Sequence, residues 1–313
     1  MKILITGAAG YIGSHVAERL QSIGNEVVGL DNFSDYYDVS LKEMNASVLK
    51  IKGIKIEKID LRFPDQLTIL PTDFDYIFHF AAQPGISASS SFEDYLGNNV
   101  ISTKNILDFA LKNQNLKLFV NIATSSVYGI HATFDESVVP SPASFYGVTK
   151  LAAEQLVLAS SRAGKIKACS LRLYSVYGPR ERPEKLYTKL IANAFNNIPF
   201  PLFKGSEKHL RSFTYVQDIV DGVVSVIGKE DLVNNEIINL GTEVENTTLQ
   251  GIEIVEQILN KKIAIQVVDA RAGDQMRTNA VIDKARKLLN YNPQTSLKEG
   301  LEEQVKWYQD NFL

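Results

Sequence analysis

The sequence predicts an α/β protein built on a doubly wound parallel sheet, with a smaller and discontinuous C-terminal lobe. Short apolar runs alternate with amphipathic stretches through the first half of the chain. Most of these runs are apolar along most of their length, which is typical of strands that helices cover on both faces. Right-handed crossovers between such strands produce the doubly wound arrangement.

The expected elements follow from these patterns in chain order. Apolar runs predict strands at residues 2–6, 26–30, 54–59, 75–80, 117–123 and 166–173. Amphipathic patterns predict helices at residues 13–23, 92–113 and 145–162. A later helix and the apolar run 237–240 are expected to return to the same sheet.

The pattern loosens after residue 173, where prolines and shorter, irregular elements replace the regular alternation. This change predicts that the chain divides into two units. The larger unit is expected to comprise residues 1–173 and about 217–240, and the smaller lobe residues 174–216 and 241–313. A length of 313 residues fits one large domain with such a lobe.

The composition is ordinary for a globular protein, and its details narrow the functional classes. The net charge of −3 gives no general attraction to nucleic acid polymers or anionic membranes. Cys169 is the only cysteine, which excludes a disulfide within the chain and favours a reducing compartment. The N-terminal residues read as a buried strand rather than a signal peptide, and no apolar run approaches the roughly 20 residues that span a bilayer. We therefore expect a cytoplasmic protein.

A glycine-rich turn after the first expected strand indicates a dinucleotide site. Gly7, Gly10 and Gly13 fall between this strand and the first helix. The first glycine permits a tight turn, the second a close approach of the backbone to a pyrophosphate, and the third close packing of helix on strand. The phosphates then lie on free amide groups at the helix N-terminus. Three glycines alone also fit an ordinary turn.

Asp31, at the end of the second expected strand, favours the dinucleotide interpretation. It stands at about the distance from the glycines that is expected of a carboxylate binding the adenosine ribose hydroxyls. The same carboxylate repels a 2′-phosphate, so NAD is predicted in preference to NADP. Asp60-Leu61 after the third strand are expected beside the adenine, and Phe80-Ala81-Ala82 after the fourth beside the pyrophosphate.

Tyr146 and Lys150 are one helical turn apart and therefore share a face of the expected helix 145–162. A lone Tyr-x-x-x-Lys pattern is common, but here the preceding strand ends in Thr124-Ser125-Ser126, whose hydroxyls are expected near the tyrosine. Free tyrosine has a pKa of about 10, too high for an efficient base at neutral pH. A neighbouring ammonium group favours the phenolate, so the pattern indicates acid–base chemistry by Tyr146.

With these motifs the chain resembles the extended short-chain dehydrogenase/reductases, and among them the NAD-dependent nucleotide-sugar epimerases and dehydratases, over essentially its whole length. The motifs that carry the resemblance are Gly7 to Gly13, Asp31, His79-Phe80-Ala81-Ala82, Thr124-Ser125-Ser126-Val127-Tyr128-Gly129, Tyr146 with Lys150, Tyr177-Gly178-Pro179-Arg180, Arg211-Ser212-Phe213-Thr214-Tyr215-Val216, Ala272-Gly273-Asp274 and Leu289-Asn290-Tyr291-Asn292-Pro293. The resemblance implies a Rossmann domain that binds NAD and a lobe that binds the nucleotide sugar.

The resemblance also implies roles for individual residues. Tyr146 is expected to be the base, Lys150 to support its phenolate, and Thr124 to hydrogen-bond the same sugar hydroxyl. The residues expected to bind NAD are Gly7, Gly10, Tyr11, Ile12, Gly13, Asp31, Asn32, Asp60, Leu61, Phe80, Ala81, Ala82, Asn99, Tyr146, Lys150 and Tyr174. Those expected to bind the substrate are Gln83, Gly85, Thr124, Ser125, Ser126, Ser175, Arg182, Arg211, Arg271 and Asp274. The arginines are candidates for the diphosphate, which suits a planar, multi-donor cation.

The residues beside Thr124 favour one reaction of the family. In related 4,6-dehydratases an Asp–Glu pair follows this threonine, and in related decarboxylases an acidic residue assists as the carboxylate leaves. Ser125 and Ser126 stand here instead, and neither is a general acid–base at neutral pH. A 4-epimerisation of a UDP-sugar through a transient 4-keto intermediate is therefore predicted. The segments most similar to UDP-glucuronate 4-epimerases are Asp35-Tyr36-Tyr37-Asp38, Ala82-Gln83-Pro84-Gly85-Ile86 and Pro179-Arg180-Glu181-Arg182-Pro183.

Four departures from the pattern keep other interpretations open. Ser87 stands where these epimerases often have arginine, Ser175 where threonine is common, and Ser212 and Gln217 where aspartates are frequent. Ser87 removes a positive partner for a sugar carboxylate, so a UDP-glucose/UDP-galactose 4-epimerase is the nearest alternative. A nucleotide-sugar dehydratase or decarboxylase comes next, and then a non-catalytic NAD-binding relative.

The expected partners are a UDP-sugar and a second copy of the chain. The four histidines do not show the spacing of metal ligands, so no metal is expected. The resemblance implies a homodimer in which helices near 95–113 and 145–162 of the two copies form a four-helix bundle.

Overall fold

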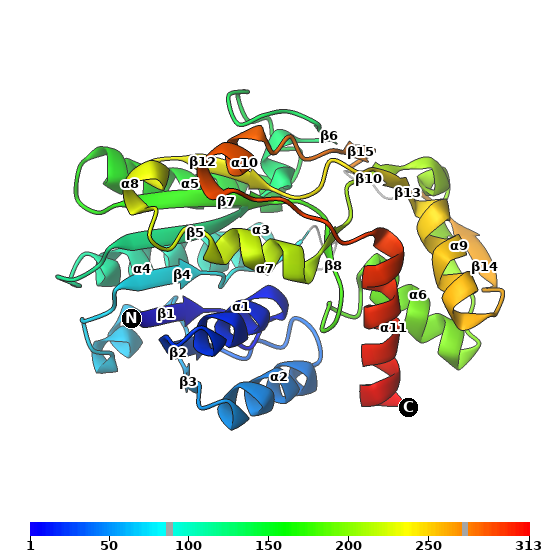
Figure 1. Cartoon of the computed structure of the whole chain (residues 1–313), viewed down its shortest axis with the longest axis horizontal. Helices are drawn as coiled ribbons and strands as arrows, with labels where there is room; N and C mark the ends of the chain where they lie inside the picture. Colours follow the sequence, from blue (N-terminus) through cyan, green and yellow to red (C-terminus); the bar gives the residue numbers. More distant parts are fainter. Residues whose placement is uncertain (86–89, 271–274) are drawn as a thin grey trace.

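A seven-stranded parallel sheet forms the centre of the computed structural model, which describes residues 1–85, 90–270 and 275–313 (Figure 1). Every neighbouring pair of its strands is parallel. In spatial order the strands are β12 (Ile237–Leu240), β7 (Ala168–Leu173), β5 (Leu118–Thr124), β4 (Tyr76–His79), β1 (Lys2–Thr6), β2 (Glu26–Asp31) and β3 (Lys55–Lys58). The order reverses between β1 and β4, as in a doubly wound sheet. The predicted fold class is confirmed.

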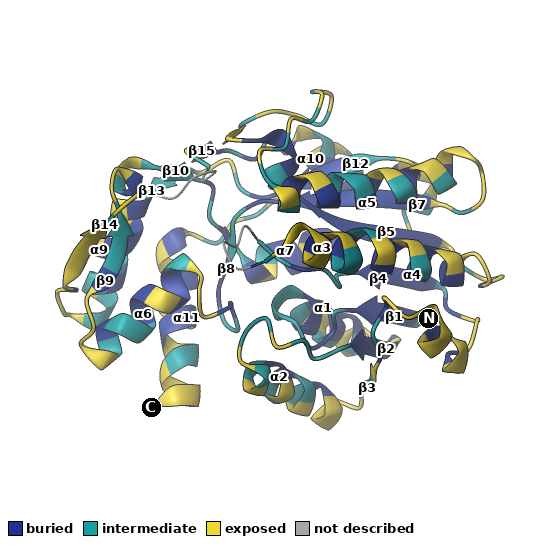
Figure 2. Cartoon of the chain, turned by 180° about the vertical axis from the view of Figure 1, so that it is seen from behind, coloured by how far each residue is buried: buried dark blue, intermediate teal, exposed yellow. Residues whose placement is uncertain are grey.

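Alternating side chains of the strands build a separate core on each face of the sheet. In β1, Ile3 and Ile5 point into one core and Leu4 into the other, and all three are fully buried. The helices α1 (Tyr11–Ser22), α2 (Val39–Ile51) and α7 (Val216–Val224) contribute to the first core, and α4 (Ser102–Ala110) and α5 (Phe145–Arg162) to the second. Figure 2 shows the buried strands between helices whose outer faces are exposed.

The helix expected at 92–113 is interrupted, and it ends earlier than predicted. α3 (Phe92–Tyr95) leads into a π-turn at Leu96–Ile101, and regular helix resumes only with α4. The wider turn is held at Gly97, whose carbonyl oxygen accepts hydrogen bonds from the backbone N–H and the hydroxyl of Ser102. Turns of this kind are frequent at functional sites.

The smaller lobe has an apolar core of its own. α6 (Leu186–Asn196), α9 (Thr248–Leu259) and α11 (Leu297–Phe312) pack with the parallel pair β9 (Phe200–Phe203) and β14 (Ile265–Val268). Tyr187, Ile252 and Leu301 are among its buried side chains. In Figure 1 this lobe lies beyond one end of the strands of the main sheet.

Short strands connect the two units. A four-stranded sheet joins β6 (His131–Ala132) to β10 (Leu210–Arg211), β13 (Asn246–Thr247) and β15 (Arg277–Thr278), and β8 (Val176–Tyr177) pairs with β11 (Thr214–Tyr215). The remaining short elements are α8 (Glu230–Val233) and 3₁₀ turns at Pro64–Ile69, Ser125–Tyr128 and Ser206–Lys208.

One segment of the expected lobe packs on the main sheet instead. α10 (Asp283–Leu289) follows Ala280 and Ile282, and Ala280, Ile282 and Leu289 are buried in the same core as Ile3 and Ile5. The sequence offers no local signal for this, because α10 packs against elements that lie far from it in the sequence, such as β12. The division of the chain into two units otherwise remains a prediction.

Within the described residues, no helix combines the length and apolar character needed to cross a membrane.

Candidate active site

A cavity of about 660 Å³ lies at the carboxyl ends of β1, β2, β4, β5 and β7, between the main sheet and the smaller lobe. Ligands of open α/β sheets bind at this edge, near the reversal of strand order. The predicted site residues that line the cavity are Gly7, Gly10, Tyr11, Ile12, Gly13, Asp31, Asn32, Asp60, Leu61, Phe80, Ala81, Ala82, Gln83, Gly85, Thr124, Ser125, Ser126, Tyr146, Lys150, Tyr174, Ser175, Arg182 and Arg211. The fold therefore brings together residues that lie as far as 204 positions apart.

Three predicted residues stand apart from this set. Asn99 is buried behind the cavity and does not belong to its lining. Its side chain accepts a hydrogen bond from the Gln83 backbone N–H (2.7 Å) and donates one to Thr149 (3.0 Å). Arg271 and Asp274 lie outside the described residues, as does Ser87.

The glycine turn is packed too tightly for side chains. Gly7 has φ +70°, and a Cβ atom there would lie 2.8 Å from the backbone nitrogen of Ala81. A Cβ atom at Gly13 would lie 2.2 Å from the carbonyl oxygen of Gly7. The turn thus presents bare backbone at the N-terminus of α1, where amide groups and the helix dipole favour phosphate oxygens.

Asp31 ends β2 and holds the surrounding loops together. One of its carboxylate oxygens accepts a hydrogen bond from the Ala9 backbone N–H (3.0 Å), and the other from the Phe33 backbone N–H (2.9 Å). Asn45 on α2 donates to the carbonyl oxygen of Ala9 (2.9 Å) and fixes the same turn from the other side. The carboxylate is therefore held at the cavity wall beside the glycine turn.

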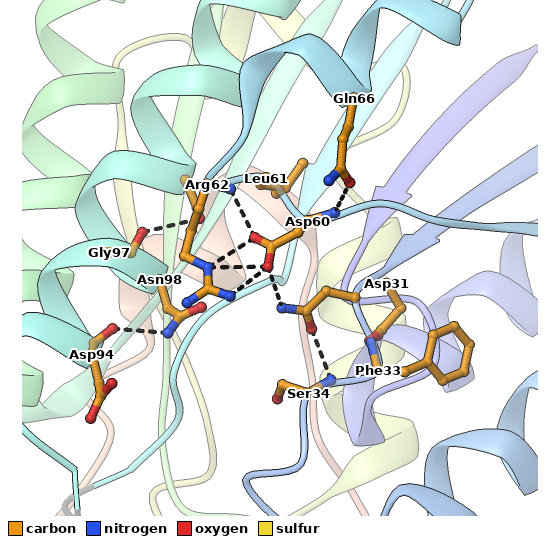
Figure 3. Close-up of polar contacts among 12 residues, drawn as sticks. Asp31, Phe33, Ser34, Asp60, Leu61, Arg62, Gln66, Asp94, Gly97 and Asn98 are labelled. Atoms are coloured by element: carbon orange, nitrogen blue, oxygen red, sulfur yellow. Dashed lines mark hydrogen bonds and ion pairs between the residues drawn. The ribbon is translucent and has the colours of Figure 1, made fainter.

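Figure 3 shows the wall formed by the loop after β3. Asp60 accepts hydrogen bonds from the guanidinium group of Arg62, the shortest at 2.6 Å, and from the Asn32 side chain (3.4 Å). The Asp60 backbone N–H donates to the Gln66 side chain (2.7 Å). Burial raises the pKa of Asp60, but its hydrogen bonds with Arg62 and the positive charge of Arg62 outweigh burial and hold that pKa below its usual value. The sequence argument did not include Arg62.

Lys42 lines the cavity, and the sequence argument missed it as well. It is buried on α2, and its ammonium group donates to the carbonyl oxygen (2.7 Å) and the hydroxyl (3.1 Å) of Ser34. The same nitrogen lies 4.8 Å from the centre of the Tyr37 ring. Burial lowers the pKa of Lys42, while nearby Asp31 raises it. Its place directly after the Asp35–Asp38 motif was the available signal.

Tyr146 and Lys150 lie in the first turns of α5, whose N-terminus is capped by the Ser144 hydroxyl. The Lys150 ammonium is buried and donates to the carbonyl oxygen of Ile122 (2.6 Å). Burial lowers the pKa of Lys150 to about 8, and the carboxylate of Glu154 acts in the opposite direction.

The surroundings of Tyr146 differ from the sequence expectation. Burial raises the pKa of Tyr146, whereas hydrogen bonding with Thr124 and the positive charge of Arg182 lower it. Burial is the strongest of these influences, so the protein groups alone do not favour the phenolate. The sequence argument considered charge but had no measure of how deeply the ring lies in the protein.

The Thr124–Ser126 turn ends β5 beside the catalytic helix. The Thr124 hydroxyl donates to the Ser126 hydroxyl (3.2 Å) and accepts a hydrogen bond from the Ser126 backbone N–H (3.1 Å). All three hydroxyls of this turn line the cavity together with Tyr146. The arrangement offers neutral hydrogen-bonding groups beside the candidate base.

Cationic residues line the end of the cavity that faces the smaller lobe. Arg182 forms an ion pair with Glu184 (2.6 Å), and its guanidinium carbon lies 5.8 Å from the centre of the Tyr36 ring. A Cβ atom at Gly85 would lie 3.2 Å from the Arg182 guanidinium, so only glycine leaves that group its full space. Arg211 lines the same part of the cavity from β10. A diphosphate fits such a set of donors.

Glu181 is a buried carboxyl group in the cavity wall that the sequence argument did not assign. It accepts hydrogen bonds from the Thr188 hydroxyl (3.1 Å) and from the Gln304 side chain (3.0 Å). Burial raises the pKa of Glu181 to about 7, although these hydrogen bonds lower it.

Among the described residues, no cluster of three potential metal ligands occurs.

Comparison with known proteins places the same features in one family. The sequence profile of the NAD dependent epimerase/dehydratase family matches residues 3–241. A protein of Bacillus subtilis (strain 168) named as an uncharacterised UDP-glucose epimerase is 36% identical over 98% of both chains. A UDP-glucuronate 4-epimerase of Thermodesulfobacterium geofontis is 35% identical over 99% of this chain and 96% of its own. The crystal structure of UDP-glucuronic acid 4-epimerase from Bacillus cereus in complex with UDP-glucuronic acid and NAD aligns over 100% of both chains, with a TM-score of 0.93 and 33% identity.

Proposed function

The chain belongs to the NAD-dependent epimerase/dehydratase family, and we propose that it catalyses the 4-epimerisation of UDP-glucuronate to UDP-galacturonate through a transient 4-keto sugar. The observation that carries this proposal is the neutral Thr124–Ser126 turn beside Tyr146 and Lys150. The relatives named as UDP-glucuronate 4-epimerases support the choice of substrate.

Residues at the dinucleotide end of the cavity fit NAD, the cofactor of the family. The bare backbone of Gly7 and Gly13 suits a pyrophosphate, and Asp31 suits the hydroxyls of the adenosine ribose. Asn32, Asp60 and Leu61 would border the adenine. Bound NAD supplies the acceptor and donor of a hydride at C4 of the sugar. Denaturing the purified protein and identifying the released nucleotide tests this assignment, which requires NAD rather than NADP.

Three side chains carry the proton chemistry in this proposal. Tyr146 removes the proton of the 4-hydroxyl group and returns it when the ketone is reduced. Thr124 hydrogen-bonds the same oxygen from the end of β5. The Lys150 ammonium, fixed on the carbonyl oxygen of Ile122, and the positive nicotinamide ring of bound NAD would together favour the phenolate. Since burial raises the pKa of Tyr146, a positive charge near the ring is needed for it to act at neutral pH.

The serines explain why epimerisation is favoured over loss of water or carbon dioxide. Oxidation of glucuronate at C4 creates a 3-keto acid, whose carboxylate departs when its breaking bond aligns with the ketone π system. Ser125, Ser126 and Ser175 line the cavity. In this proposal they would hold the carboxylate by neutral hydrogen bonds, out of that alignment. The Thr124–Ser126 turn lacks the acidic side chain that elimination and decarboxylation use.

The nucleotide part of the substrate is assigned to the lobe end of the cavity. Arg182 and Arg211 would hold the diphosphate, with Gln83 and Gly85 beside the sugar. Arg271 and Asp274 remain sequence predictions for the same region. A neutral UDP-hexose is the second candidate substrate, because Ser87 leaves a carboxylate without an arginine partner at that position and one relative is named as a UDP-glucose epimerase.

A second copy of the chain is proposed to cover α3, the following π-turn and α5. Exposed apolar side chains lie on these helices, among them Phe92, Ile101, Phe145 and Val148. The rings of Phe92 and Phe145 are 5.3 Å apart, so the two helices share one apolar face. Sedimentation of the wild type and of Val148→Asp tests the dimer, which the variant should dissociate.

Incubation with UDP-glucuronate, UDP-glucose and UDP-galactose, followed by NMR of the products, tests the proposed function. Conversion of UDP-glucuronate to UDP-galacturonate is expected. Turnover of the neutral hexoses alone would reject the uronate and leave the epimerase standing, whereas accumulation of UDP-xylose or a 4-keto pentose would reject epimerisation.

A further inference from the structure

A chain of buried hydrogen bonds passes through His79, the last residue of β4. Its Nδ1 atom lies 2.7 Å from the Thr6 hydroxyl oxygen at the end of β1, and its Nε2 atom lies 2.8 Å from the Thr103 hydroxyl oxygen on α4. Thr6 and His79 are fully buried, and Thr103 nearly so. His79 itself does not line the cavity and has no part in the proposed proton chemistry.

The directions of these hydrogen bonds fix the tautomer of His79. The Thr103 hydroxyl donates to the carbonyl oxygen of Asn99 (2.6 Å), which can only accept, so the Thr103 oxygen must accept from His79 Nε2–H. On the other side, the Ala81 backbone N–H donates to the Thr6 hydroxyl oxygen (3.1 Å), leaving the Thr6 proton for His79 Nδ1. The ring is therefore neutral and carries its proton on Nε2.

The neutral state agrees with the environment of the ring. Burial, together with the charge of Lys150, lowers the pKa of His79 to about 3. A cationic His79 would place a second positive charge near the Lys150 ammonium in the protein interior. The ring thus serves as a fixed donor and a fixed acceptor.

Beyond Thr103, the chain continues to the catalytic helix. The Asn99 side chain lies in the π-turn and donates to the Thr149 hydroxyl (3.0 Å), which itself donates to the carbonyl oxygen of Phe145 (2.8 Å). Phe145 precedes the candidate base, Tyr146. The Asn99 side chain also accepts from the Gln83 backbone N–H (2.7 Å). The π-turn therefore connects the loop after β4 to the first turn of α5.

His79 connects the loops at the dinucleotide turn to the hydrogen bonds that lead to α5. Its Nδ1 side leads to Thr6 and Ala81, which border the glycine turn of the dinucleotide site. Its Nε2 side leads to Thr103 and Asn99, and from there to α5. The His79 ring thus connects the cofactor turn, through Thr103 and Asn99, to the helix that carries the candidate base.

We propose that His79, as its Nε2–H tautomer, is a positioning residue that sets the catalytic helix in register with the dinucleotide turn. The positioning of Tyr146 rests on the proposed function, whereas the tautomer and the retention of NAD can be measured without a substrate. A displacement of about 1 Å between such groups is sufficient to reduce turnover by roughly a hundredfold.

Each of two substitutions should preserve one hydrogen bond of the His79 ring and remove the other. In His79→Gln the amide nitrogen can take the place of Nε2 and keep the bond to Thr103, while the bond to Thr6 is lost. In His79→Asn the amide oxygen can take the place of Nδ1 and keep the bond to Thr6, while the bond to Thr103 is lost. Opposite defects are therefore expected from two polar residues that differ by one methylene group.

We expect His79→Asn to retain NAD on purification but to lower kcat roughly tenfold or more, with KM for the UDP-sugar little changed. His79→Gln should keep kcat within about threefold at saturating NAD but should be purified with a smaller fraction of bound NAD. The same two substitutions at His131, an exposed residue of β6, are the matched control and should change neither quantity. Equal defects in both properties for both His79 variants would overturn the positioning role.

A spectroscopic measurement on the wild type tests the tautomer of His79 without depending on how the variants fold. In the ¹⁵N-histidine-labelled wild type, which contains four histidines, the His79 signals should show a protonated Nε2 and an unprotonated Nδ1 at neutral pH. A ring protonated on Nδ1, or on both nitrogens, would overturn the proposal even if no UDP-sugar is turned over. Failure of the proposed function is thereby distinguished from failure of the role of His79.

Discussion

Gly147 on α5 lies directly against the backbone of Ser126, and a Cβ atom at Gly147 would be 2.7 Å from the Ser126 carbonyl oxygen. The absence of a side chain at this one position lets the catalytic helix approach the turn that carries the three hydroxyls. Tyr146, next to Gly147, and Thr124, two residues before Ser126, both line the cavity. In the proposed reaction they contact the same sugar oxygen.

Gly147→Ala is expected to reduce turnover by about an order of magnitude or more, because α5 must move away from the Thr124–Ser126 turn. Alanine favours a helix over glycine by up to about 1 kcal/mol, so a purely helical effect would stabilise the protein. Initial rates and melting temperatures separate the two effects. Gln155→Ala, at an exposed position on the same helix, is the control. Unchanged turnover in Gly147→Ala would show that the close contact is not needed.

Tyr146→Phe keeps the packing of the ring but removes the ionisable oxygen. We expect kcat to fall by about two orders of magnitude or more, while NAD content and melting temperature stay near the wild-type values. Tyr308→Phe, in α11 of the smaller lobe, controls for loss of a phenolic oxygen elsewhere. If Tyr146→Phe turned over at a rate near that of the wild type, another group would have to be the base.

The charge of Lys150 should govern the alkaline side of the pH–rate profile. Burial lowers the pKa of Lys150 to about 8, so the ammonium is charged below that pH and loses its charge as the pH rises through it. Turnover of the wild type is therefore expected to decline above about pH 8. Arginine stays charged throughout this range. Lys150→Arg should therefore shift the decline in kcat to higher pH by at least about one unit, even if its maximum kcat is lower.

The test is kcat measured from pH 6 to 10 for both proteins, at saturating substrate. Lys104→Arg, on the exposed face of α4, should leave the profile unchanged. A decline at the same pH in the wild type and in Lys150→Arg would assign the titration to a different group.

Glu181 should make stability depend on pH. Burial raises the pKa of Glu181 to about 7 in the folded protein, whereas an unfolded glutamate titrates near its ordinary value of 4.5. Between these two values only the folded state holds the proton, so the free energy of unfolding falls as pH rises and the loss is complete above about pH 7. The shift sets an upper limit of about 3 kcal/mol for this loss.

Glu181→Gln cannot ionise and should melt at a higher temperature than the wild type at pH 8, with little difference at pH 5. Thermal unfolding across this range measures the effect. Glu302→Gln, at an exposed position on α11, should follow the wild type. A Glu181→Gln protein that is less stable than the wild type at pH 8 would contradict a buried, proton-binding carboxyl group.

Much of the fold was predictable because its signals are local. β5, for example, is buried along its whole length and is apolar except for Asn121 and Thr124. The glycine turn, Asp31 and the Tyr146–Lys150 pair each occupy a fixed place relative to a strand end or a helical turn. These short-range relations, with the family resemblance, were sufficient to predict a large part of the cavity lining but less than half of it. The roles of the lining residues remain predictions.

The missed features depend on contacts between distant segments. The hydroxyl groups of Ser102 and Thr103 on α4 donate to carbonyl oxygens of the π-turn at Leu96–Ile101. Thr103 is in turn hydrogen-bonded to His79 at the end of β4. Lys42 becomes a lining residue only because the loop after β2 folds back over α2. The raised pKa of Tyr146 reflects the depth of the cavity wall. Apart from the position of Lys42 after the Asp35–Asp38 motif, these relations leave no periodic or motif-like trace in the sequence.

The central claim is that a hydride leaves C4 of the sugar and returns to the same carbon from the opposite face. UDP-glucuronate deuterated at C4 and incubated with the purified protein in ordinary water tests it directly by NMR. The account predicts UDP-galacturonate that retains the deuterium at C4 and the carboxylate at C5. A C4 epimer that has exchanged its deuterium for solvent hydrogen, or a pentose formed with release of carbon dioxide, would contradict it.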